Sequence, residues 1–109
     1  MLELWQTEWC PASRRVRQRL TELGVDYLIR QVPVDKAERD RLRHAAGTDV
    51  IPALVLADGE VAIGEDAILR ALDGSVADPA QAESHRQKAE KARRRYLEEE
   101  CECSQPATR

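Results

Sequence analysis

The stretch Trp-Cys-Pro-Ala-Ser at residues 9–13 determines the predicted fold, because it lies between a predicted strand and a predicted helix. Residues 2–5 alternate apolar and polar side chains, which is typical of a short β-strand. Pro11 suits the first position of a helix, where the N–H that proline lacks has no helical partner. Apolar residues then recur at helical spacing until Gly24, which favours a left-handed helix cap. The sequence therefore predicts that Cys10 joins a strand to the start of a helix.

The chain beyond this helix continues the alternation of strands and helices. Residues 25–34 are rich in β-branched and apolar side chains and predict a second strand. Asp35 is followed three residues later by Glu38, a capping-box arrangement that predicts an exposed, charged helix over residues 36–46. The order strand, helix, strand implies that the first two strands are parallel.

The middle of the sequence predicts a β-hairpin followed by a helix. Residues 53–56 are apolar on both faces, as expected of a central strand. The Asp-Gly pair at residues 58–59 is a strong tight-turn signal, and residues 60–63 form the return strand. A helix is expected over residues 65–74. We therefore predict an α/β fold in which helices flank a four-stranded mixed sheet.

The composition changes after residue 74, so we divide the chain into a domain at residues 1–74 and a carboxy-terminal part at residues 75–109. The second part predicts a charged helix from about residue 78 to about residue 100, followed by a mobile tail with Cys101 and Cys103. These two cysteines could resolve a disulfide at Cys10, bind a soft metal, or be an incidental exposed pair. Two thiolates do not complete a zinc site, so no metal-binding residues are assigned.

Composition and charge narrow the class of protein. The 109 residues fit one domain, and the net charge of −3 indicates no polyanionic partner such as nucleic acid. The basic residues at 86–95 are interspersed with acids, as on a solvated helix face. The longest uncharged apolar stretch, residues 50–57, is too short for a membrane span, and the amino terminus lacks signal-peptide features. Three cysteines without a signal peptide favour reduced thiols, so we expect a cytoplasmic protein.

Cys10 is the strongest candidate for a reactive residue. A thiol at a helix N-terminus faces unpaired N–H groups and the positive end of the helix dipole, which can lower its pKa from about 8.5 to about 3.5–7.5. Arg14 and Arg15 add positive charge, and Ser13 lies where its hydroxyl or N–H can reach the sulfur. A low-pKa, accessible cysteine is a nucleophile toward disulfides. A cysteine that only caps the helix is the structural alternative.

Two further segments contain candidate binding residues. Pro52 begins a predicted strand, and a cis bond after Ile51 would expose a backbone edge to an extended ligand, whereas a trans bond is the commoner form. Gly64 precedes Glu65 and Asp66 at a predicted helix start, where the acids can hold an ammonium group beside a carboxylate. Acidic residues are also ordinary in the first turn of a helix.

Together the three segments resemble the glutaredoxin family and, equally, the amino-terminal domain of glutathione transferases. The resemblance covers about two-thirds of the chain and implies a thioredoxin-like (glutaredoxin-type) fold, here with an added carboxy-terminal helix. It implies that Cys10 attacks glutathione mixed disulfides, helped by Pro11 and Ser13. It also implies that the small thiol binds at Ile51, at a cis Pro52, and at Glu65 and Asp66.

The expected function is that of a monothiol thiol–disulfide oxidoreductase acting on mixed disulfides between protein thiols and a small thiol. Ser13 stands where dithiol glutaredoxins have a second cysteine, and Pro11 replaces the glycine of iron–sulfur-carrying members. Glutathione is the expected small thiol. Another small thiol is an alternative, because the lysine that many members carry shortly before the cysteine is absent. A transferase would need a large all-helical second domain, which the residues after Gly74 are too few to supply.

Two other functions are retained as alternatives. The first is a non-catalytic thioredoxin-fold adaptor that binds a protein partner at the proline edge and the carboxy-terminal helix. The second is a metal- or iron–sulfur-binding protein.

Overall fold

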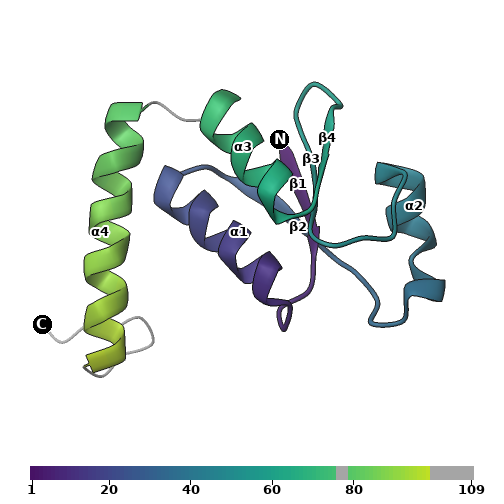
Figure 1. Cartoon of the computed structure of the whole chain (residues 1–109), viewed down its shortest axis with the longest axis horizontal. Coiled ribbons are helices and arrows are strands. Elements are labelled where there is room, and N and C mark those ends of the chain that lie inside the picture. The colour runs from purple at the N-terminus through teal and green to yellow at the C-terminus, as the bar shows by residue number, and fades with distance from the viewer. Residues whose placement is uncertain (76–78, 99–109) are drawn as a thin grey trace, which may run out of the picture.

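A computed structural model describes residues 1–75 and 79–98 of the chain. Its elements follow the predicted order (Figure 1). They are β1 (Leu2–Gln6), α1 (Pro11–Leu23), β2 (Tyr27–Gln31), the 3₁₀ turn η1 (Lys36–Glu38), α2 (Asp40–Ala46), β3 (Ala53–Val55), β4 (Val61–Ile63), α3 (Glu65–Ser75) and α4 (Pro79–Glu98).

The four strands form one mixed sheet in the order β2-β1-β3-β4. Strand β1 is parallel to β2 and antiparallel to β3, and β4 is antiparallel to β3. The register sets Leu4 in β1 opposite Ile29 in β2 and Leu54 in β3. The predicted parallel pair and hairpin are both confirmed.

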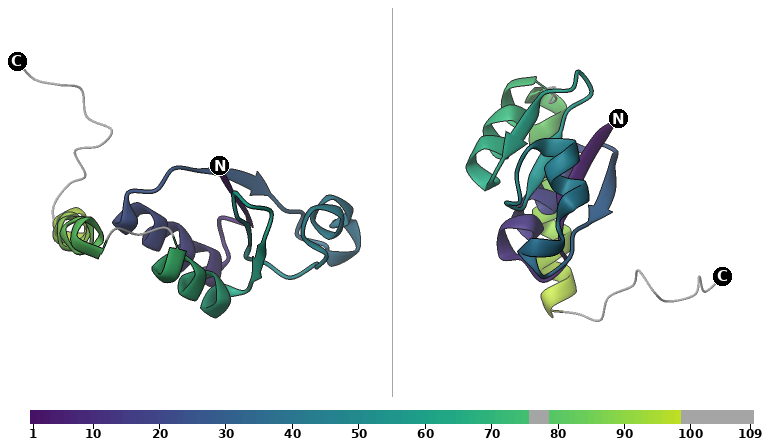
Figure 2. Two further views of the ribbon diagram at one scale, coloured as in Figure 1. Left: turned by 90° about the horizontal axis from the view of Figure 1, so that it is seen from above. Right: turned by 90° about the vertical axis from the view of Figure 1, so that its right-hand side faces the viewer.

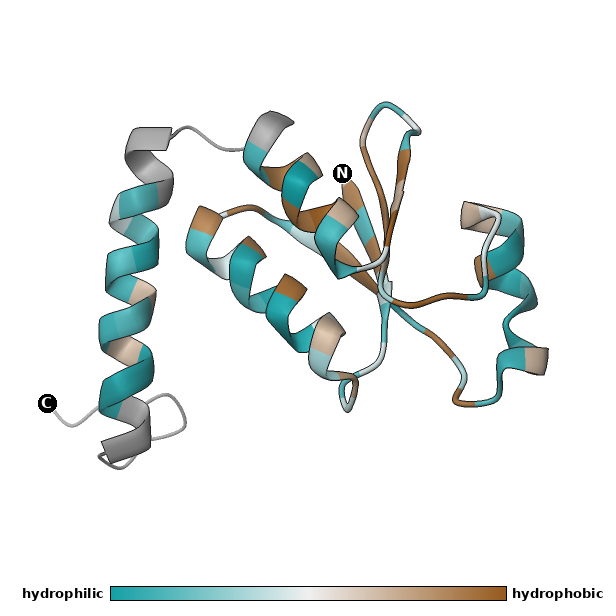
Figure 3. Ribbon diagram, viewed as in Figure 1, coloured by the Kyte–Doolittle hydropathy of each residue, from teal (hydrophilic) through white to brown (hydrophobic). Residues whose placement is uncertain are grey.

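The sheet buries apolar side chains on both of its faces. Helices α1 and α3 cover one face and α2 covers the other (Figure 1). Figure 3 shows the apolar residues gathered on the strands and on the sides of α1 and α3 that face them. The larger core contains Leu2, Leu4, Val16, Leu20, Leu23, Leu54, Ala62, Ile68 and Leu72, and the smaller one contains Trp5, Val32, Leu42 and Ala53.

Two turns follow directly from local sequence. Gly24 ends α1 in the left-handed conformation with φ of 67°, and its N–H bonds to the carbonyls of the last turn. Gly59 has φ of 91° in the hairpin turn, where the Asp58 carboxylate accepts a 2.9 Å hydrogen bond from the Glu60 N–H. Both glycines adopt a backbone conformation that most side chains disfavour.

The predicted second strand is longer than the observed one. Strand β2 spans Tyr27–Gln31, whereas residues 25–34 were expected. At one end the Val25 N–H bonds back to the Leu20 carbonyl, 3.1 Å away, as part of the helix cap. At the other end Pro33 has no N–H to donate to a neighbouring strand. Strand pairing is therefore confined to the residues between these two points.

The prediction of one helix over residues 36–46 is wrong. The segment forms η1 and α2, with Arg39 between them in a non-helical conformation. The Arg39 side chain is buried and donates to the carbonyls of Pro33, Val34 and Asp49 at 2.8, 3.1 and 2.9 Å. Bringing the guanidinium to these carbonyls interrupts the helix. The Asp35 carboxylate does cap the segment, by accepting from the Ala37 N–H at 2.9 Å.

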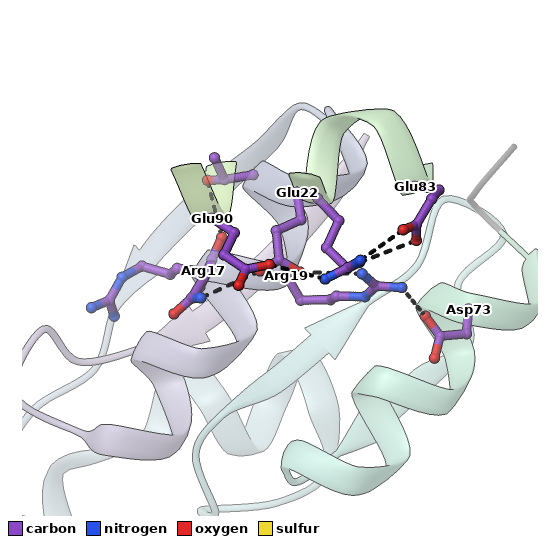
Figure 4. Close-up of polar contacts among 9 residues, drawn as sticks. Arg17, Arg19, Glu22, Asp73, Glu83 and Glu90 are labelled. Atoms are coloured by element: carbon purple, nitrogen blue, oxygen red, sulfur yellow. Dashed lines mark hydrogen bonds and ion pairs between the residues drawn. The ribbon is translucent and has the colours of Figure 1, made fainter. Parts of the chain in front are cut away.

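Helix α4 confirms the predicted carboxy-terminal helix and packs along the outside of α1, away from the sheet (Figure 2). It is largely hydrophilic (Figure 3), and charged residues gather where it packs against α1, with Asp73 of α3 near Arg19 (Figure 4). Arg19 in α1 bonds to Asp73 in α3 at 2.8 Å, and Glu83 lies close enough to Arg19 for their charges to attract. Cys101 and Cys103 lie outside the described residues. No described helix is long and apolar enough to cross a membrane.

Candidate functional site

Cys10 is the N-cap residue of α1. Its backbone is extended, with φ of −77° and ψ of 119°, and Pro11 occupies the start of the helix. The Sγ atom accepts a hydrogen bond from the Ser13 N–H at 3.4 Å, and the Cys10 carbonyl accepts from the Arg14 N–H at 3.0 Å. The thiol is a half-buried free cysteine. The reactive candidate therefore serves as the helix cap that serine or aspartate more often supplies.

The surroundings of Cys10 favour the thiolate. Burial acts to raise the pKa of the thiol, but hydrogen bonding from Ser13 and Ala12 and the charge of Arg15 outweigh it, so the pKa lies below its ordinary value. Within the described residues the Ser13 hydroxyl is buried and makes no hydrogen bond of its own. It can turn its proton toward a thiolate, while the backbone N–H already has hydrogen-bond geometry.

The segment before β3 holds the second group of candidates. The Ile51–Pro52 peptide bond is cis, and Pro52 is buried. No backbone hydrogen bond joins Ile51 to another residue in the described ranges. The Pro52 carbonyl accepts from the Gly64 N–H at 2.9 Å, which ties this segment to the start of α3. The backbone of Ile51 is thus available to an extended ligand.

Glu65 and Asp66 begin α3 but differ in their contacts. The Glu65 carboxylate is mostly buried and accepts two short bonds, of 2.5 and 2.6 Å, from Nε of Arg15 in α1. Asp66 is exposed and makes no hydrogen bond or ion pair with the other described residues. Charge interactions therefore link Arg15 both to the Cys10 thiol and to the Glu65 carboxylate, whereas Asp66 takes no part in them.

Three arginines support the site and were not predicted in these roles. Arg15 links Glu65 to the surroundings of Cys10. Arg17 donates to the buried Gln6 side chain and, at 3.2 Å, to the Thr7 carbonyl, and so holds the loop that presents Cys10. Arg39 holds Asp49, three residues before Pro52. For Arg15 and Arg17 the sequence signal was the run of arginines in α1, and for Arg39 there was none, because the partners of all three lie elsewhere in the fold.

Among residues 1–75 and 79–98, no cluster of three or more histidine, cysteine, aspartate or glutamate side chains has an arrangement that could hold a metal ion.

Comparison with known families identifies the domain. A family model described as the N-terminal domain of glutathione S-transferase matches residues 9–75, which include all three candidate segments. The chain belongs to the glutathione S-transferase N-terminal domain family. Of the two resemblances that the sequence suggests, the family match supports the transferase amino-terminal domain. No curated protein matches the chain at a significant level.

Solved structures agree with this family. A glutathione S-transferase from Rhodospirillum rubrum F11 is 28% identical, with a TM-score of 0.61 over 72% of this chain and 35% of its own. A glutathione S-transferase from Methylobacillus flagellatus KT, solved with glutathione bound, is 25% identical, with a TM-score of 0.59 over 70% of this chain and 37% of its own. The thioredoxin-like protein BC3987 is 31% identical, with a TM-score of 0.50 over 59% of this chain and 86% of its own.

These likenesses confirm the predicted thioredoxin-like fold. The chain spans little more than a third of the length of the two transferases it matches. The match to the BC3987 protein covers 86% of that protein and 59% of this chain.

Proposed function

We propose that this domain is a monothiol thiol–disulfide oxidoreductase that acts on mixed disulfides between protein thiols and glutathione. The observation that carries the proposal is the Sγ atom of Cys10 at the N-terminus of α1, hydrogen-bonded to the Ser13 N–H and held at a lowered pKa. Thiolates, rather than thiols, attack disulfides. A thiolate in this position is the nucleophile that the reaction needs.

The reaction proceeds by two thiolate exchanges. The Cys10 thiolate attacks the glutathione sulfur of the mixed disulfide, forms a Cys10–glutathione disulfide, and releases the protein thiolate. A second glutathione thiolate then attacks the glutathione sulfur on Cys10, releases the Cys10 thiolate, and leaves as glutathione disulfide. The second thiol comes from solution because Ser13, and not a cysteine, follows Cys10 by three residues.

The Arg15–Glu65 pair supports glutathione as the small thiol. The γ-glutamyl end of glutathione carries both an ammonium and a carboxylate group. Glu65 offers an acceptor for the ammonium, and Arg15 offers a cation for the carboxylate. The Nε atom of Arg15 lies 2.5 Å from the Glu65 carboxylate. Ile51, with its unpaired backbone beside Pro52, suits the peptide portion. The related Methylobacillus flagellatus transferase was solved with glutathione bound.

The test uses the chain with Cys101 and Cys103 replaced by serine, so that Cys10 is the only thiol. Turnover of a glutathionylated peptide is measured with glutathione as reductant. We expect turnover in this parent and none after Cys10→Ser. Turnover that survives Cys10→Ser would overturn the proposal.

A second comparison tests glutathione itself. Glu65→Gln should raise KM for the glutathione mixed disulfide and leave KM for a mercaptoethanol mixed disulfide unchanged, because mercaptoethanol lacks the γ-glutamyl end. Asp66→Asn is the matched control, since it removes the neighbouring carboxylate without breaking an ion pair. Equal effects of Glu65→Gln on both substrates would point to another small thiol.

A non-catalytic adaptor is the second candidate function. Trp9, beside Cys10, is 61% exposed, and Val50, just before Ile51, is 43% exposed. Exposed apolar side chains next to an open backbone segment suit a protein partner. A Cys10 thiol of ordinary pKa that forms no mixed disulfide would favour this function.

A further inference from the structure

A groove with a predominantly basic lining runs between α1 and the helices α3 and α4. Its volume is about 610 Å³, and four arginines line it against a single carboxylate, that of Glu22. The arginines are Arg14, Arg15 and Arg19 from α1 and Arg93 from α4. Leu69 of α3 contributes the apolar part of the wall. A groove of this size accommodates a small organic molecule.

Two of the four arginines have no acidic partner among the residues that the structure describes. Arg15 pairs with Glu65, and Arg19 pairs with Glu22 and Asp73 (Figure 4). By contrast, Arg14 and Arg93 form no ion pair or hydrogen bond with another side chain in residues 1–75 and 79–98. Two guanidinium groups from different helices therefore line one groove, and no described carboxylate pairs with either of them. Guanidinium groups match the planar geometry of carboxylate and phosphate.

The groove lies next to the candidate nucleophile, although Cys10 itself does not line it. Arg14 lies one helical turn after Cys10, and its N–H bonds to the Cys10 carbonyl at 3.0 Å. The charge of Arg15, another lining residue, acts directly on the Cys10 thiol. Leu69 lies one turn after Glu65 on α3. The basic groove therefore begins about one helical turn after Cys10 and runs along the side of α1 where α4 packs.

We propose that this groove binds the half of the disulfide that leaves when Cys10 attacks, and that it favours substrates with carboxylate or phosphate groups close to the leaving sulfur. The inference rests on the proposed function, in which glutathione occupies the Ile51, Pro52 and Glu65 side of the thiol. When Cys10 bonds to the glutathione sulfur, the other half leaves as a thiolate and gains one negative charge. Arginines without a described acidic partner stabilise that charge as well as the acidic groups already present.

The experiment compares two disulfide reagents in the variant whose only thiol is Cys10. Dithiobis(nitrobenzoate) has a carboxylate on each half, and dithiodipyridine is neutral. Rates are measured by stopped flow at a pH where Cys10 is fully ionised, so that a change in its pKa does not affect the comparison. Arg14→Ala combined with Arg93→Ala should slow the anionic reagent by about tenfold. The rate with the neutral reagent should fall much less, because only its leaving sulfur develops a negative charge.

Lys91→Ala is the matched control for Arg93→Ala. Lys91 is an exposed cation on the same helix, but it lies two residues from Arg93 and outside the groove lining. Its removal changes the net charge equally and should leave both rates unchanged. Added salt should reduce the preference of the parent for the anionic reagent and have little effect on the double variant.

Two outcomes would overturn the inference. One is an equal fall in both rates, which would mean that the substitutions disturb the thiol itself. The other is an equal loss from Lys91→Ala and Arg93→Ala, which would mean that only net charge matters. Failure of the proposed function gives a different result. The protein would then show the predicted reagent preference but would not turn over glutathione mixed disulfides. That result would support the anion site and contradict the oxidoreductase function.

Discussion

Arg15 and Glu65, fifty residues apart in the chain, form a close ion pair in which one guanidinium nitrogen lies 2.5 and 2.6 Å from the two carboxylate oxygens. The pair joins α1 to α3 beside the Cys10 thiol, whose pKa the Arg15 charge helps to lower. One arginine thus connects the candidate nucleophile to the candidate acidic binding residue.

Arg15→Ala should move Cys10 alkylation to higher pH. The Arg15 charge favours the thiolate, so its loss raises the pKa of the Cys10 thiol and slows alkylation near neutral pH. The measurement is the pH midpoint of iodoacetamide alkylation in the variant whose only thiol is Cys10. Arg15→Lys should retain most of the shift, and Arg14→Ala should cause little. An unchanged midpoint in Arg15→Ala would mean that the helix terminus alone activates the thiol.

Cys10 should make the stability of the protein depend on pH. Its thiol pKa is lower in the folded chain than in the unfolded chain, so ionisation favours folding. This contribution is complete above the unfolded thiol pKa of about 8.5 and is lost as the pH falls through the folded value. Urea unfolding of the Cys10-only variant and of its Cys10→Ser derivative should therefore diverge as the pH rises through this window. Parallel profiles would contradict the shift.

Arg39→Ala should destabilise the fold by about 2 kcal/mol or more, because it leaves three carbonyls without their charged donor. Arg39→Lys should recover part of the loss. Arg41→Ala, two residues along the chain in α2, is the control. It removes an exposed cation 5.7 Å from the Trp5 ring and should cost less than about 1 kcal/mol. Chemical unfolding measures all three, and equal losses from Arg39→Ala and Arg41→Ala would argue against the carbonyl contacts.

Gly24→Ala should destabilise the contact between α1 and α4 as well as the helix cap. Gly24 has φ of 67°, where a Cβ atom costs about 1–2 kcal/mol. The added atom would also stand 3.0 Å from Nε2 of His85 in α4. In a double-mutant cycle with His85→Ala, the cost of Gly24→Ala should fall but not vanish. An unchanged cost would show that His85 moves aside freely.

The sequence predicted the elements whose causes are local. Cys10 and Pro11 at a helix start, Gly24 at its end and the Asp58-Gly59 turn each depend on residues within a few positions, and the structure has all of these elements. The inward turn of Arg39 depends on carbonyls six and ten residues away, and it divided a helix predicted as continuous. Such a buried cation looks like any surface arginine in the sequence.

In the candidate site, too, the local features were predictable from the sequence and the long-range contacts were not. The sequence indicated the three segments individually, but only the family resemblance suggested that they meet. In the structure the contact between the Gly64 N–H and the Pro52 carbonyl holds two of the segments together, and Arg15 connects the third. Both contacts depend on how the chain folds, so no local pattern could reveal them. The cis state of the Ile51–Pro52 bond was equally hidden, because the sequence permits either isomer.

The use of Cys10 as the cap of α1 has a consequence for the reaction cycle. The sulfur that would bond to glutathione is the same atom that accepts the Ser13 N–H. A sulfur in a disulfide has no charge and is a weak acceptor, so disulfide formation at Cys10 weakens the cap. The first turn of α1 should then fray more readily, and amide exchange at Ser13 should quicken. Disulfide formation at Cys10 should therefore loosen the start of α1, next to the exposed side chain of Trp9.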